Sequence, residues 1–130
     1  MKRLSISLCA GLLLALAVPA SAHHSFAAQY DPEKPVTLTG TVTKVEWTNP
    51  HARFYMDVKG DDGKSANWNF ELASPNYLKR AGWSSTSLKQ GDIVKVEGSL
   101  ARSGANMANA STVTFADGTR VFARSAQDNR

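Results

Sequence analysis

The sequence predicts a mainly β protein, a small Greek-key barrel of five to six strands with one short helix. Three observations lead to this fold class. Apolar and polar residues alternate in several short segments, turn residues separate most of these segments, and only one segment carries helix-start signals. A chain of 130 residues is long enough for one domain and too short to divide its core between two.

The first 22 residues have the pattern of an export signal. A basic start is followed by an apolar stretch, Leu4 to Val18, and then by the small residues Ala20-Ser21-Ala22. The apolar stretch is shorter than the roughly 20 residues that span a bilayer. Cys9 lies in its middle, whereas a lipoprotein signal has its cysteine at the end. We therefore expect cleavage after Ala22, a periplasmic or secreted location, and no stable membrane insertion afterwards.

Cleavage would change the composition of the working chain. Of 130 residues 108 would remain, and the net charge would fall from +4 to +2 because two basic residues leave with the signal. The only cysteine would leave as well, which excludes disulfides, cysteine nucleophiles and thiolate zinc sites. A charge of +2 is no electrostatic footprint for nucleic acid, so we expect no nucleic-acid partner.

The first predicted strand follows a polar segment. Residues 23–35 are expected to form an extended N-terminal arm, and residues 36–124 the barrel. From Val36 to Trp47, threonines alternate with apolar residues until the apolar phase shifts after Gly40. Such a shift indicates a β-bulge or a sharp bend, which small barrels use to curl one strand between two sheets.

The next two strands are predicted to form a hairpin. His51 to Val58 and Ala66 to Leu72 both alternate, and the turn at residues 60–63 joins them. Each strand should turn its apolar residues toward the core. The opposite, polar face of the first strand carries His51, Arg53, Tyr55 and Asp57.

A single helix is predicted from Pro75 to Ala81, with Ser74 as the N-cap and Gly82 as the C-cap. Strands are predicted after it over residues 93–100, 111–115 and 119–123, and residues 125–130 are expected to be a disordered tail. A long bent first strand and one helix between the third and fourth strands are typical of a five-stranded OB-like barrel. The alternative is a generic antiparallel sandwich.

The histidines carry the main functional hypothesis. Cleavage after Ala22 would make His23 the N-terminal residue, so that its α-amine and imidazole Nδ1 could chelate one metal ion. Amine and imidazole nitrogens suit Cu(II), and another imidazole, from His24 or His51, would complete a three-nitrogen copper site. The alternative is that the terminal histidines are an exposed polar start and that His51 bonds a neighbouring group.

The second hypothesis is a periplasmic ligand- or protein-binding module without a metal. Arg53, Tyr55 and Asp57 share one strand face, and OB barrels bind extended ligands across such faces. Motifs of serine hydrolases, P-loops, dinucleotide sites and zinc proteases do not occur, and Glu46, Asp57 and Glu71 read as ordinary exposed carboxylates. We therefore expect a non-catalytic protein.

Several motifs together resemble one family. These are His23-His24-Ser25-Phe26, residues 40–52 with Val-Glu-Trp-Thr-Asn-Pro-His, Trp68-Asn69, residues 71–76, Gly82-Trp83 and Gly91-Asp92. They resemble small exported bacterial proteins classed as a domain of unknown function, and the resemblance covers nearly the whole mature chain. It implies a periplasmic or secreted domain and carries no activity to transfer, so the copper hypothesis rests on the histidines alone.

Overall fold

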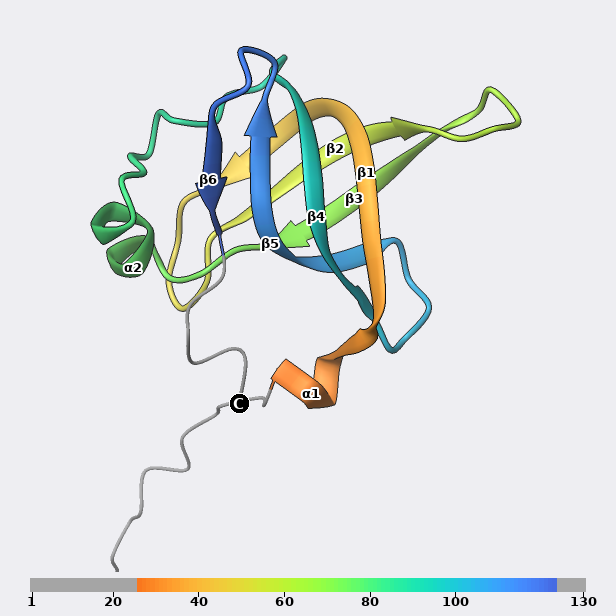
Figure 1. Cartoon of the computed structure of the whole chain (residues 1–130), viewed down its shortest axis with the longest axis horizontal. Helices are drawn as coiled ribbons and strands as arrows, with labels where there is room; N and C mark the ends of the chain where they lie inside the picture. The colour runs from red at the N-terminus through yellow and green to blue at the C-terminus, as the bar shows by residue number, and fades with distance from the viewer. Residues whose placement is uncertain (1–25, 124–130) are drawn as a thin grey trace, which may run out of the picture.

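The computed structural model describes residues 26–123, in which two short helices accompany a curled sheet (Figure 1). The predicted signal, His23, His24 and the predicted tail 125–130 lie outside the described residues. In chain order the elements are α1 (Phe26–Gln29), β1 (Tyr30–Glu46), β2 (Arg53–Lys59), β3 (Ser65–Glu71), α2 (Pro75–Arg80), β4 (Ile93–Ala101), β5 (Met107–Phe115) and β6 (Arg120–Phe122).

Five strands close into a ring in the order β1-β2-β3-β5-β4, and β4 returns to β1. All these pairings are antiparallel except that of β3 with β5, a short parallel contact that closes the ring. β6 pairs with the outer edge of β5. This connectivity is that of the OB type, so the predicted mainly β, OB-like fold is confirmed. The sheet curls on itself, unlike the two stacked sheets of the sandwich alternative.

The long strand β1 pairs with two neighbouring strands because it bends. Its first part pairs with β4 as far as Thr41, and its second part pairs with β2 from Gly40 onward. The register shifts between Val42 and Lys44, which confirms the predicted bulge or bend. Gly40 is required for close approach at the bend, since a Cβ there would lie 2.4 Å from the backbone oxygen of Asp57.

The core fills the inside of the ring. In β2 the buried residues alternate with more exposed ones, as the sequence predicts. The rings of Phe54 and Phe70 stack at its centre with their centroids 5.1 Å apart. Other side chains buried there are Val42, Met56, Leu72, Leu78, Val94, Val96 and Val113.

The structure corrects the start of β1. The strand begins at Tyr30, six residues before the predicted start at Val36, so the segment expected as an extended arm is one helical turn, α1, followed by strand. Pro32 and Pro35 do not end the strand, because the irregular register between Tyr30 and Pro35 accommodates them beside β4.

Two further differences concern the later elements. β5 begins at Met107, four residues before the predicted start, because its first residues pair with β3, a partner that local alternation cannot reveal. The predicted helix α2 forms with Ser74 as its N-cap, but it ends at Arg80 and its C-cap is Ala81, not Gly82 as predicted.

Candidate functional site

A buried carboxylate lies at the end of β3. Glu71 is 7% exposed, and its neighbour Phe70 is fully buried. Because successive strand residues point to opposite faces, both faces of β3 are covered at this end. The prediction that Glu71 is an ordinary exposed carboxylate is therefore wrong.

Three side chains surround the Glu71 carboxylate. The hydroxyl of Tyr30 donates a hydrogen bond of 2.9 Å to Oε2, and Nη2 of Arg53 forms an ion pair with the same oxygen. Nδ1 of His51 lies 3.8 Å from Oε1. Arg53 also donates to the Asn69 side-chain oxygen at 3.3 Å. A buried charge that is both paired and hydrogen-bonded avoids the large cost of an isolated one.

Tyr30 is the most deeply buried of the three side chains around the Glu71 carboxylate. It is 1% exposed, and burial together with the nearby negative charge of Glu71 raises the pKa of its hydroxyl well above the ordinary value. The hydroxyl therefore keeps its proton and acts as a permanent donor to the carboxylate. No local pattern predicts this contact, because the two partners are 41 positions apart in the chain.

The hydrogen bonding of His51 determines which ring nitrogen is available. Its Nδ1 lies 3.1 Å from the backbone oxygen of Leu72. A carbonyl oxygen can only accept, so Nδ1 carries a proton, and in the neutral ring Nε2 then keeps its lone pair. Metal-binding histidines are commonly oriented in this way, with one ring nitrogen donating to a backbone carbonyl. The side chain is 37% exposed, so His51 is suited to bind a metal through Nε2.

The N-terminal end of the described chain lies against the same cluster. The ring of Phe26 stacks on that of Tyr30 with centroids 5.6 Å apart and an interplanar angle of 29°. Arg102 fixes this segment, since its Nε donates to the Ala27 oxygen at 2.7 Å and its guanidinium pairs with Asp31. Phe26, the first described residue, thus lies beside the surroundings of Glu71.

The predicted ligand-binding residues lie in a row on the outer face of β2, and each already contacts a neighbour. Arg53 contacts Glu71, and the hydroxyl of Tyr55 donates to Glu46 at 3.4 Å. Lys44 lies over the Tyr55 ring, 5.4 Å from its centroid. Asp57 accepts a hydrogen bond of 2.8 Å from Asn67. The row faces outward as predicted, but of its three members only Arg53 belongs to the Glu71 cluster.

The described residues alone do not form a complete metal site. Within residues 26–123, no group of three or more His, Cys, Asp or Glu side chains is arranged to hold a metal ion. His51 is the single predicted metal ligand in this range.

Among residues 26–123, no helix has the length and the apolar character that a membrane-spanning helix needs.

Comparison with known proteins identifies a family and supports the fold. The sequence model of DUF6152, a family of unknown function, matches residues 10–110. No curated protein matches the chain in sequence. Among solved structures, the chain is similar to the mitochondrial single-stranded DNA binding protein Rim1 of S. cerevisiae, with a TM-score of 0.50 and 10% identity over 64% of this chain and 93% of that chain. At this identity the similarity shows the fold alone.

Proposed function

The chain belongs to DUF6152, a family of unknown function, and we propose that it is an exported, non-catalytic domain that binds copper through an N-terminus processed at His23. Its role would be to carry, buffer or deliver the metal. Export rests on the signal pattern of residues 1–22, and removal of that signal would free the α-amine of His23.

The proposed ligands are nitrogen atoms of two or three residues. The α-amine and Nδ1 of His23 would form the chelate, and Nε2 of His51 would supply a third nitrogen. His24 is the alternative source of that third nitrogen. Nitrogen ligands of this kind favour Cu(II) over the other common divalent ions.

The stacking of Phe26 on Tyr30 is the observation that carries the proposal. The Tyr30 hydroxyl contacts Glu71, whose carboxylate lies beside His51. Phe26 follows His23 by only three positions, about 10 Å of extended chain. So short a chain before Phe26 supports a site that His23 would share with His51.

The Glu71 cluster would support this site without binding the metal directly. Its carboxylate is already engaged by Tyr30 and Arg53, so it provides a fixed negative charge beside the His51 ring. The hydrogen bond to Leu72 holds the proton on Nδ1. Loss of such outer-shell partners typically weakens metal affinity about 10- to 100-fold.

Electron paramagnetic resonance of Cu(II) bound to protein beginning at His23 tests the ligand set. Three equatorial nitrogens are expected in the native protein, and His51→Ala should change the nitrogen hyperfine pattern and weaken binding. Tyr55→Ala, which alters the strand that follows His51 without touching the proposed ligands, is the matched control. A spectrum unchanged by His51→Ala but changed by His24→Ala would assign the third nitrogen to His24. No stoichiometric copper binding would contradict the proposal as a whole.

The row on β2 favours a second candidate, a metal-free binding module. Arg53, Tyr55 and Asp57 face outward, and β3 places Asn69 and Asn67 opposite the last two. OB folds bind oligonucleotides and oligosaccharides across the face of these two strands. Binding found on glycan or peptide arrays should then survive a chelator and be lost in Tyr55→Ala. Binding that needs a metal and tolerates Tyr55→Ala would contradict this candidate.

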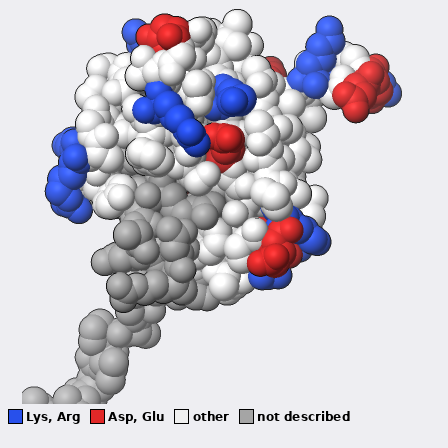
Figure 2. Space-filling model, in the orientation of Figure 1, with Lys and Arg blue, Asp and Glu red and all other residues white. Residues whose placement is uncertain are grey.

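We do not expect nucleic acid as the ligand. Figure 2 shows acidic and basic side chains interspersed on the displayed face, without a continuous basic surface. Several charged side chains of the described residues are paired, as in Arg120 with Glu97 at 3.1 Å. Nucleic-acid binding relies on basic side chains that remain free to neutralise phosphates. Salt-dependent binding of single-stranded oligonucleotides, measured by fluorescence anisotropy, would contradict this expectation.

A further inference from the structure

The hairpin of β2 and β3 projects beyond the ring, and one of its edges is open (Figure 1). β5 lies beside β3 only from Asn69 to Glu71. Within residues 26–123, no strand lies along that side of residues 65–68. An open edge of this kind is a template for another strand.

The register shows which backbone groups face the open edge. The N–H of Asn69 points away from β2, since it donates to the backbone oxygen of Asn106 at 3.0 Å. In an antiparallel pair, the direction of the backbone groups alternates with every residue, and the register of β2 with β3 is regular. The N–H and C=O groups of Ser65 and Asn67 therefore point outward as well, whereas those of Ala66 and Trp68 face β2.

The other candidate edge, on β6, is already used. The backbone oxygen of Phe122 accepts a hydrogen bond of 3.0 Å from Nε1 of Trp83. The oxygen of Ala123 accepts one of 2.7 Å from the N–H of Ala73. The open edge of β3 is thus the better site for strand addition.

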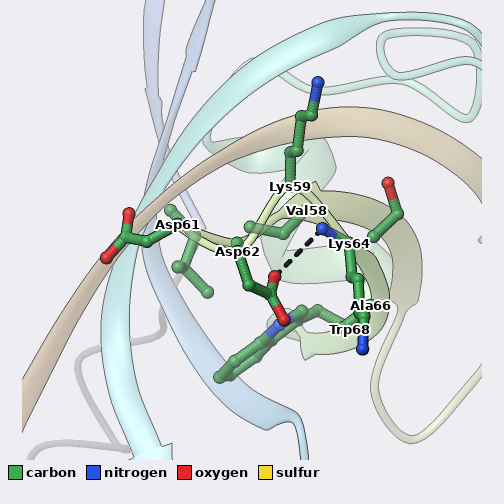
Figure 3. A pocket seen from close by; sticks show the side chains of 10 residues that line it. Val58, Lys59, Asp61, Asp62, Lys64, Ala66 and Trp68 are labelled. Carbon is green, nitrogen blue, oxygen red and sulfur yellow. Dashed lines mark hydrogen bonds between the residues drawn. The ribbon is translucent and has the colours of Figure 1, made fainter.

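A hollow of about 390 Å³ adjoins this edge (Figure 3). Lys64, Ala66 and Trp68 line it from β3 and its preceding turn, and Leu38 and Val58 line it from β1 and β2. Figure 3 shows the Asp62 carboxylate turned toward the Trp68 ring. The hollow therefore offers an apolar floor and the Asp62 carboxylate to a chain paired along the edge.

We propose that the open edge of β3 pairs with the same edge of a second copy of this chain. An antiparallel pairing centred on Ala66 would place Ser65 of each copy opposite Asn67 of the other. In this register four hydrogen bonds would satisfy the N–H and the C=O group of Ser65 and of Asn67 in both copies. The small side chain of Ala66 at the two-fold axis would permit the close approach of the strands.

The charges at the hairpin tip support a second copy as the occupant. The tip carries two lysines and two aspartates, so it has no net charge and does not repel a second copy: Lys59, Asp61, Asp62 and Lys64. In the proposed register, Lys64 of one copy lies opposite Trp68 of the other copy. The Asp62 carboxylate beside that Trp68 belongs to the same copy as the tryptophan. A lysine over a tryptophan face near a carboxylate is a favourable arrangement. The pairing is independent of the N-terminal histidines.

Sedimentation velocity over a range of concentrations tests the pairing. Because the paired segment is short, we expect a weak, reversible dimer that becomes populated toward about 1 mM. Asn67→Pro removes an outward N–H and should shift the dissociation constant upward by at least about tenfold, or 1.4 kcal/mol. Asn67→Ala, which keeps the backbone groups, is the matched control and should dimerise as the native chain does.

Amide hydrogen exchange of the native protein gives a second test that needs no variant. Protection of the Ser65 and Asn67 amides should rise with protein concentration. The amides of Ala66 and Trp68, which face β2, should show constant protection and serve as internal controls. A monomer at every concentration would overturn the proposal, and so would a dimer in which the Ser65 and Asn67 amides stay unprotected.

Discussion

Replacing Glu71 by glutamine removes one buried negative charge while preserving the size of the side chain. Both the Tyr30 hydroxyl and the Arg53 guanidinium bind Oε2 of this residue. A hydrogen bond to a charged group contributes about 1.5–3 kcal/mol, and loss of one partner of a buried ion pair costs about 3–5 kcal/mol. Arg53 is 30% exposed, so water recovers part of its loss. We expect Glu71→Gln to lower the free energy of unfolding by about 2 kcal/mol.

Urea and thermal unfolding followed by tryptophan fluorescence measure this effect. A loss of about 2 kcal/mol corresponds to a Tm lower by about 8–16 °C for a domain of this size. Glu46→Gln is the matched control, because Glu46 also pairs with a cation but on the surface. It should leave the unfolding midpoint unchanged. A Glu71→Gln protein as stable as the native one would refute the reasoning that this cluster holds the end of β3.

Three further predictions concern other contacts. Burial raises the pKa of Tyr30 in the folded state above the ordinary value of 10, so its contribution to stability persists below that pH and is lost as pH rises above it. In urea titrations at increasing pH, Tyr30→Phe should start less stable than the native protein and lose less stability above pH 10. Gly40→Ala places a Cβ 2.4 Å from the Asp57 oxygen and should lower the free energy of unfolding by about 1–3 kcal/mol, measured in urea; an unchanged midpoint would show that the bend relaxes freely. Ser74→Ala removes the N-cap bond to Tyr77 and should cost about 1 kcal/mol in the same assay, whereas an equal midpoint would mean that α2 is held by packing alone.

Local sequence patterns were sufficient to predict several parts of the fold. The inward and outward faces of β2, the bend of β1 after Gly40 and the N-cap of α2 all follow from neighbouring residues. The beginnings of β1 and β5 do not, because each rests on a strand distant in sequence. Pairing partners of this kind leave no periodic signal in a single chain.

The candidate site shows the same limit. The alternation of side chains along β3 correctly placed Glu71 on the face opposite Phe70, but that face is covered by other residues and is not exposed to solvent. Tyr30 covers it from the start of β1, a contact that depends on the closure of the ring. The polar row of β2 was predictable, whereas the proton position on His51 depends on the Leu72 carbonyl and required the three-dimensional structure.

Copper affinity at the processed N-terminus tests the central proposal most directly. The Cu(II) dissociation constant of protein beginning at His23 is compared, by competition with a chelator, with that of protein carrying one additional residue before His23. The extension keeps every imidazole and removes the α-amine from position 23, so the affinity should fall by at least about tenfold. Equal dissociation constants for the two proteins would contradict copper binding through the processed N-terminus.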